Sequence, residues 1–218
     1  MKYYIIAGEA SGDLHASNLM KALLLEDPEA VFRFWGGDKM QEVGGTLVKH
    51  YKELAFMGFW EVFINLKTIL NNIGFCKKDI LEYKPDAIIY IDYPGFNLRI
   101  AAWAKKQNFK NLYYISPQIW AWKEKRISKI KRDLDALFVI LPFEKTYFKE
   151  KHNYGVQYVG NPLVDVIQEA IQEKDDFRSN QKLDQNTQLI ALLPGSRKQE
   201  ILKMMPTFIK VIERFPQY

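Results

Sequence analysis

Short apolar runs alternate with longer amphipathic stretches along the chain. Most runs lack alternating polar positions, as is typical of strands buried on both faces of a parallel sheet. The pattern predicts strands at Lys2–Ala7, Val31–Trp35, Ala87–Ile91, Asn111–Ile115, Ala136–Ile140, Val156–Val159 and Leu189–Leu193. It predicts helices at Asp13–Glu26, Phe59–Tyr83, Phe96–Gln107, Lys123–Arg132, Phe143–Lys151, Leu163–Glu173 and Glu200–Phe215. This alternation favours an α/β fold with a doubly wound parallel sheet.

Residues 172–188 have the composition of a linker, because Lys, Asp, Asn and Gln are frequent and there is little to bury. One strand and one helix follow, and a single such pair cannot form a core of its own. We therefore expect a domain over residues 1–171, the linker, and the beginning of a second, truncated domain over residues 189–218. The alternative is that the last strand joins the first sheet.

The composition, with 48% hydrophobic and 26% charged residues, is that of a soluble globular protein. Cys76 is the only cysteine, which excludes an internal disulfide and a cysteine-rich zinc site. No apolar run approaches the ~20 residues that cross a bilayer, and Glu9 comes too early for a signal peptide. These features predict a cytosolic protein. The net charge of +5 and the 14% of aromatic residues indicate a surface that meets an anionic or apolar partner.

The segment Gly8–Asp13 connects the first strand to the first helix, at the sheet edge where α/β proteins bind ligands. Gly8 and Gly12 permit a close backbone approach, and Ser11 or Asp13 can cap the helix. The alternative is a tight turn with a helix cap and no ligand. The segment lacks the G-x-G-x-x-G spacing, and its acidic residues would repel a pyrophosphate, so an NAD site is disfavoured.

A second junction, Leu193–Ile201, carries the opposite charge. The N-terminus of a helix offers free N–H groups, and Arg197 adds a planar, bidentate cation. This combination predicts a phosphate site, with a capped turn and a solvated arginine as the alternative. Asp92 directly follows the buried strand Ala87–Ile91, where partial desolvation would raise its pKa and suit it to accept a proton. The alternative for Asp92 is a turn or cap residue.

Two further segments combine aromatic residues with charge or apolar neighbours. The segment Ser116–Trp122 continues into Lys123–Arg132, which has six basic residues and one acidic residue. It could bind nucleic acid or an anionic membrane, or form a solvated helix whose tryptophans lie in the core. The segment Ala55–Leu66 is apolar all round, so it is either interior or an exposed patch. The three histidines are scattered, and no metal site is predicted.

Six motifs together are similar to those of the lipid-A-disaccharide synthase family. They are Gly8–Asp13, Leu54–Gly58, Asp92–Asn97, Ser116–Trp122, Leu141–Glu144 and Leu193–Arg197. The resemblance implies a GT-B glycosyltransferase with two Rossmann-like domains, of which the first binds the acceptor and only the start of the second is present. It implies an inverting reaction of UDP-2,3-diacylglucosamine with 2,3-diacylglucosamine 1-phosphate (lipid X), without a metal or cofactor. The products would be lipid A disaccharide 1-phosphate and UDP.

The resemblance also implies roles for individual residues. Asp92 matches the catalytic base, Arg197 matches the arginine that binds UDP, and Glu9 could assist the base. The positions expected to bind substrate are Gly8, Ser11, Gly12, Asp13, Asn97, Gly195, Ser196, Arg197 and Glu200. The chain departs from many members of the family at Gly95, where they carry a second Asp, and at Asn161, where they carry His.

Both expected substrates carry acyl chains and phosphates, so the resemblance implies peripheral association with the cytoplasmic face of the inner membrane. The residues expected to contact the membrane or the acyl chains are Phe56, Met57, Phe59, Trp60 and Phe63. A homodimer is possible for the full-length protein, and no nucleic acid partner is expected. The competing hypotheses are another GT-B enzyme that uses a UDP-amino sugar, such as an epimerase, and a basic RNA-binding protein.

Overall fold

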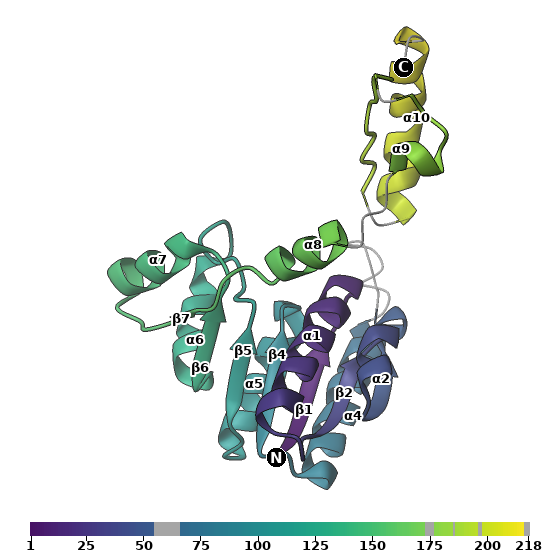
Figure 1. Ribbon diagram of the computed structural model, residues 1–218. Helices are drawn as coiled ribbons and strands as arrows, with labels where there is room; N and C mark the ends of the chain where they lie inside the picture. The colour runs from purple at the N-terminus through teal and green to yellow at the C-terminus, as the bar shows by residue number, and fades with distance from the viewer. Residues whose placement is uncertain (55–65, 173–176, 185, 196–197, 216–218) are drawn as a thin grey trace. The chain divides into compact units, whose positions relative to one another are not determined.

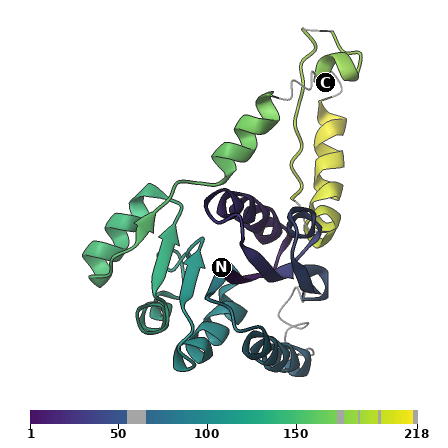
Figure 2. The same ribbon diagram turned by 60° about the horizontal axis from the view of Figure 1, so that its bottom comes forward.

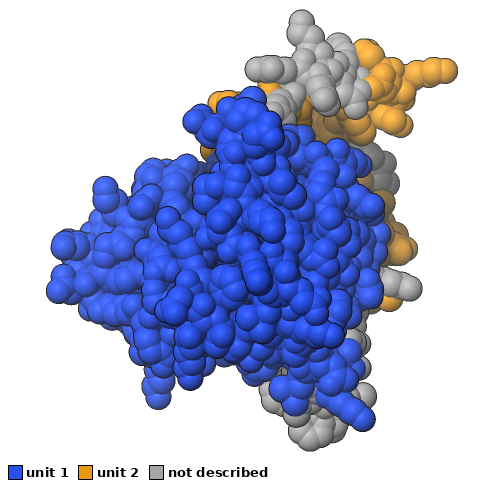
Figure 3. Space-filling view, turned by 90° about the horizontal axis from the view of Figure 1, so that it is seen from below, with its two compact units in different colours: residues 1–162 blue, residues 163–218 orange. Residues whose placement is uncertain are grey.

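The computed structural model describes residues 1–218 except 55–65, 173–176, 185, 196–197 and 216–218. The strands are β1 (Lys2–Ala7), β2 (Val31–Gly36), β3 (Thr46–His50), β4 (Ala87–Ile91), β5 (Asn111–Tyr114), β6 (Ala136–Val139) and β7 (Gln157–Tyr158). The helices are α1 (Ala10–Glu26), α2 (Asp38–Val43), η1 (Tyr51–Glu53), α4 (Leu66–Tyr83), α5 (Pro94–Lys106), η2 (Glu124–Arg126), α6 (Ile127–Asp133), α7 (Pro142–His152), α8 (Leu163–Gln172), α9 (Phe177–Asn180) and α10 (Lys198–Arg214). The chain divides into two compact units, residues 1–162 and 163–218 (Figure 3).

The first unit is built on one parallel sheet with the strand order β3-β2-β1-β4-β5-β6-β7 (Figure 1). The chain winds outward from β1 to β3, crosses back to β4 beside β1, and then winds outward in the opposite direction. The direction of winding therefore reverses between β1 and β4, where Ala7 is paired with Ile91. In an open α/β sheet, such a reversal leaves a crevice at the carboxyl ends of the two strands.

Helices cover both faces of the sheet (Figure 2). Successive side chains of each strand point to opposite faces, so an apolar strand contributes to a core on each side. Tyr4 and Ile6 of β1 pack in one cluster with buried residues of α4, α5, α6 and α7. Tyr3 and Ile5 pack in the other cluster with α1 and α2. Burial on both sides explains the continuous apolar runs from which the strands were predicted, and the doubly wound parallel sheet is confirmed.

Some predicted elements differ from those in the structure. Thr46–His50 was not predicted as a strand, because it is short and only partly buried at the edge of the sheet. Helix α1 begins at Ala10 instead of Asp13, so Ser11 and Asp13 lie inside the helix and do not cap it. The strand predicted at Leu189–Leu193 is wrong, because the segment shares no strand ladder with another described residue.

The second unit contains α8, α9 and α10. Apolar residues of α8 and α10 are exposed, among them Val164, Ile167 and Leu202. The border between the units lies at Pro162, so α8 groups with the second unit, whereas the sequence placed it at the end of the first domain. None of the described helices is long and apolar enough to cross a membrane.

Candidate active site

The candidate site lies where β1 and β4 end side by side. Since Ala7 pairs with Ile91, Gly8 and Glu9 leave the sheet beside Asp92. Glu9 occupies the N-cap position of α1 and is half-buried, and Asp92 is exposed. The sheet therefore brings the two acidic residues that the sequence proposed as catalytic into one place.

The backbone at Asp92 is held in an uncommon conformation. Asp92 and Tyr93 have φ angles of 43° and 48°, in the left-handed region that side chains other than glycine rarely adopt. The carbonyl oxygen of Asp92 accepts hydrogen bonds from Tyr113 Oη at 2.5 Å and from Asn97 Nδ2 at 2.8 Å. Strained turns of this kind persist where surrounding contacts fix them, and they concentrate at functional sites. At Asp92, the hydrogen bonds from Tyr113 and Asn97 hold the turn in place.

The surroundings of Asp92 favour its protonated form. Although the residue is exposed, the surrounding protein removes part of the hydration of its carboxyl, and this raises its pKa above the ordinary range. The negative charge of Glu9 raises the pKa further, while the backbone N–H of Tyr93 and the charge of Arg126 oppose the shift. A carboxylate with a raised pKa is a stronger base, which suits proton abstraction from a hydroxyl.

Gly8 allows the two loops to meet. A Cβ atom at Gly8 would lie 2.4 Å from the ring of Tyr93, a separation that no side chain can take without displacing the ring. At Gly12, a Cβ atom would lie 3.2 Å from the Cβ of Ala7. Both glycines are buried, whereas Ser11 is exposed at the start of α1. The two glycines therefore act through packing.

Two of the residues expected to bind substrate are buried and hydrogen-bond to the backbone. Asp13 is buried, and its carboxylate accepts hydrogen bonds from the backbone N–H groups of Gly37, Lys39 and Met40 at 2.7, 3.1 and 3.1 Å. It therefore binds the N-terminus of α2. Asn97 is fully buried and directs its amide N–H groups to backbone carbonyls, including that of Asp92. Asn97 supports the turn at Asp92 and does not face solvent.

The second unit carries the other predicted junction. Gly195 has a φ of 98°, and a Cβ atom there would lie 2.6 Å from Oε2 of Glu200, in the first turn of α10. Ser196 and Arg197 lie outside the described residues. So do the five residues expected to contact the membrane, Phe56, Met57, Phe59, Trp60 and Phe63. Their assigned roles stay predictions.

The motifs Ser116–Trp122 and Leu141–Glu144 contact each other in the first unit. Trp120 donates from Nε1 to Oε1 of Glu144 at 3.2 Å, and its ring packs edge-on against Phe143 at 5.0 Å. Glu144 is buried, and its Oε2 accepts the backbone N–H groups of Ile140 and Leu141. Trp120 and Trp122 are exposed, so the interpretation of both tryptophans as core residues is wrong.

Sequence reasoning did not single out three residues that bear on Asp92. Tyr113 holds its carbonyl, Arg126 contributes a positive charge, and Tyr93 packs beside Gly8. Tyr113 comes from β5 and Arg126 from η2, so only the fold brings them near β4. Tyr93 and Asp92 are sequence neighbours, and the Tyr-Pro-Gly that follows Asp92 was the available signal for a turn.

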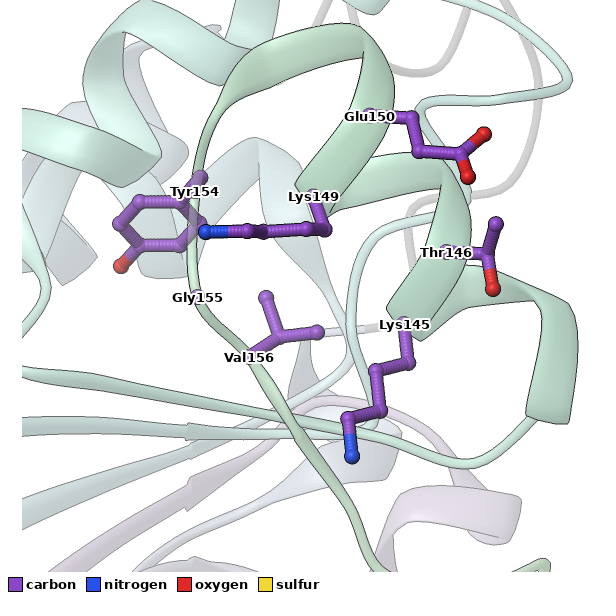
Figure 4. Close-up of a pocket in the computed structure, with 7 residues that line it drawn as sticks. All are labelled: Lys145, Thr146, Lys149, Glu150, Tyr154, Gly155 and Val156. Carbon is purple, nitrogen blue, oxygen red and sulfur yellow. The ribbon is translucent and has the colours of Figure 1, made fainter.

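Two concave surfaces of the first unit lie away from this site. Between α7 and the segment that follows it is a hollow of about 360 Å³, where Lys149 extends toward Tyr154 while Glu150 points away (Figure 4). Another, of about 480 Å³, is apolar and lies over β1, β4 and β5. Neither is lined by Asp92 or Glu9. The described residues contain no cluster of three or more His, Cys, Asp or Glu that could hold a metal ion.

Comparisons with known sequences agree with the motif set. The sequence model of a family described as lipid-A-disaccharide synthetase matches residues 3–217. Lipid-A-disaccharide synthase from Trichlorobacter lovleyi is 40% identical over 213 residues, covering 98% of this chain and 55% of that protein. Lipid-A-disaccharide synthase 1 from Legionella pneumophila is 42% identical over 206 residues, covering 94% of this chain and 53% of that protein. The chain thus spans about half the length of these relatives.

Solved structures with the same fold include two epimerases. UDP-GlcNAc 2-epimerase from Neisseria meningitidis, bound to UDP-GlcNAc, gives a TM-score of 0.67 at 11% identity, covering 100% of this chain and 64% of that chain. The enzyme from Rickettsia bellii gives a TM-score of 0.61 at 11% identity, covering 99% of this chain and 60% of that chain. At such identity the likeness concerns the fold alone.

The switch-point sheet and its structural neighbours define a Rossmann-like α/β protein of the GT-B type. Within that class, the match over residues 3–217 and the identities near 40% decide the assignment. The chain belongs to the lipid-A-disaccharide synthase family.

We expect Gly8→Ala to lower the free energy of unfolding by about 1–3 kcal/mol, because the added methyl group overpacks against Tyr93. Urea unfolding of the 218-residue chain measures the change. The matched control is Gly74→Ala in α4, where the new Cβ meets open space and should stabilise the chain by ~0.5–1 kcal/mol. Equal unfolding midpoints for Gly8→Ala and the wild type would show that Tyr93 does not constrain the loop.

Proposed function

We propose that the full-length protein is an inverting, metal-independent glycosyltransferase. It joins UDP-2,3-diacylglucosamine to the 6-hydroxyl of 2,3-diacylglucosamine 1-phosphate, forming lipid A disaccharide 1-phosphate and UDP. The family assignment supports this reaction, and the observation that carries it is the pair Asp92 and Glu9 at the switch point of the sheet. The first unit would bind the acceptor sugar.

In this reaction Asp92 removes the proton of the acceptor hydroxyl as its oxygen attacks the anomeric carbon of the donor. The bond from that carbon to the UDP oxygen breaks, and UDP leaves with the bonding electron pair. Glu9 keeps the pKa of Asp92 raised, so the carboxylate stays basic, and exposed Ser11 is available to a sugar hydroxyl. Arg197 would offset the charge that develops on the departing diphosphate.

The competing function is that of another enzyme that uses a UDP-amino sugar, such as an epimerase. An epimerase would convert a UDP-amino sugar without an acceptor. Incubating the full-length protein with UDP-GlcNAc alone, and following the sugar by NMR, separates the two. Epimerisation in the absence of acceptor would replace the transferase proposal.

We also propose that the protein associates peripherally with the inner membrane, because its substrates carry acyl chains and segment 55–66 is rich in aromatic and aliphatic residues. A homodimer of the full-length protein is part of the same proposal and is tested by its mass in solution.

Asp92→Asn keeps the shape of the side chain and removes its basicity. We expect kcat of the full-length enzyme to fall by about 10²–10⁴-fold, with little change in KM for the donor. Disaccharide formation is the assay, and Glu82→Gln, an exposed carboxylate on α4, is the control. If Asp92→Asn retained more than about a tenth of the wild-type kcat, the base would be another residue.

Replacing Glu9 by Gln removes the negative charge that raises the pKa of Asp92. A general base works only when deprotonated, so activity is lost as the pH falls through its pKa. Since Glu9→Gln lowers that pKa, the acidic limb of the kcat/KM profile should move to lower pH. The measurement is the pH–rate profile of both proteins, and an acidic limb that does not move would separate Glu9 from the base.

The triple variant Phe59→Ser, Trp60→Ser and Phe63→Ser should release the full-length protein from membranes while leaving it folded, because interfacial binding scales with buried apolar area. Co-sedimentation with vesicles and circular dichroism measure the two properties. Leu25→Ser, at an exposed position of α1, is the control. If the triple variant unfolds, the segment belongs to the core.

A further inference from the structure

The segment that follows Trp122 forms an open basic hollow that the proposed chemistry has not used. The hollow encloses about 580 Å³ and is lined by Lys123, Glu124, Lys125, Arg126 and Lys129. Lys123 directly precedes η2, the next three residues form η2, and Lys129 lies in the first turn of α6. We refer to this set as the basic hollow.

The single acidic residue of the basic hollow is already neutralised from another helix. Oε1 of Glu124 lies 2.7 Å from Nζ of Lys151 and 3.2 Å from Nε2 of His152, both on α7. The four cations of the hollow form no ion pair with the described part of the chain. Their N–H groups are therefore available to an anionic ligand.

Trp122 limits the freedom of two of these cations. Its ring is 58% exposed, with Nζ of Lys123 4.1 Å and Cζ of Arg126 5.3 Å from the ring centre. Cations are held over aromatic faces by the ring quadrupole, which leaves their N–H donors free for an anion. Guanidinium and ammonium groups together suit the oxygens of a phosphate.

The chain leaves β5 for the basic hollow at the sheet edge that carries Asp92, because Ile91 is paired with Tyr114 and the backbone N–H of Asp92 donates to the carbonyl of Tyr114 at 3.3 Å. The charge of Arg126 acts on the carboxyl of Asp92 and on Tyr113, whose hydroxyl donates to the carbonyl of Asp92. A ligand that presents a hydroxyl to Asp92 would thus extend its other end toward Arg126. In the proposed acceptor, the 6-hydroxymethyl group and the 1-phosphate are carried by the two carbons that flank the ring oxygen, so one sugar could present the hydroxyl to Asp92 and the phosphate to a neighbouring site.

We propose that the basic hollow binds the phosphate monoester of the acceptor sugar, through Arg126 with Lys123, Lys125 and Lys129. This inference rests on the proposed function, since it gives the acceptor its orientation: phosphate in the hollow, reacting hydroxyl at Asp92. It assigns a binding role to the segment that the sequence left open between a membrane, a nucleic acid and a solvated helix.

The test compares Arg126→Ala with wild type in the full-length enzyme. KM for 2,3-diacylglucosamine 1-phosphate should rise about 10- to 100-fold, because a charge-assisted contact is lost, while KM for the UDP-sugar is unchanged. With 2,3-diacylglucosamine that lacks the phosphate, the two proteins should have the same KM for the acceptor. Arg126→Lys should recover part of the loss, and Lys106→Ala, which removes an equal charge from the exposed end of α5, should behave as wild type.

Titration with glucosamine 1-phosphate and with glucosamine tests the hollow without turnover. Weaker binding of the phosphate by Arg126→Ala, with no change for glucosamine, supports the proposal even if no disaccharide is formed, in which case only the proposed function fails. Equal affinities overturn the proposal. It is also overturned if Arg126→Ala loses binding to phosphatidylglycerol vesicles while KM for the acceptor stays unchanged, because the hollow then faces a membrane.

Discussion

The pairing of β1 with β4 is the constraint on which the site depends. The sheet begins with β1 in its middle and grows outward first to β3 and then, from β4, to β7 on the other side. The two central strands consequently deliver their carboxyl ends together, with Ala7 level with Ile91. Glu9 and Asp92 are eighty-three positions apart in the chain and meet because of this pairing.

Much of the motif that marks this family serves the geometry of one turn. Gly8 leaves room for Tyr93, and Asn97 donates to the carbonyl of Asp92 from inside the protein. Asp13 performs a similar task nearby, because its carboxylate joins α1 to the start of α2. The exposed carboxylate thus depends on buried polar residues whose side chains hydrogen-bond to the backbone around it.

The sequence was sufficient for six of the seven strands and for the position of Asp92 directly after β4, because apolar runs and the residue that ends them are local signals. It was insufficient for β3, whose short edge position leaves it half-polar. The roles of Asp13 and Asn97 depend on partners distant in the chain, so their types suggested ligand contacts where the structure has backbone contacts. Arg126 was noticed only as part of a basic run, since its nearness to Asp92 is a property of the fold.

The left-handed turn at Asp92 and Tyr93 lowers the stability of the fold while it determines where the carboxylate of Asp92 points. Holding such residues out of their preferred conformations costs about 1–3 kcal/mol each, and this cost is incurred when the chain folds. A substitution that relaxed the turn would make a more stable protein with a misdirected carboxylate. The direction in which the Asp92 carboxylate points is therefore fixed at the expense of the free energy of folding.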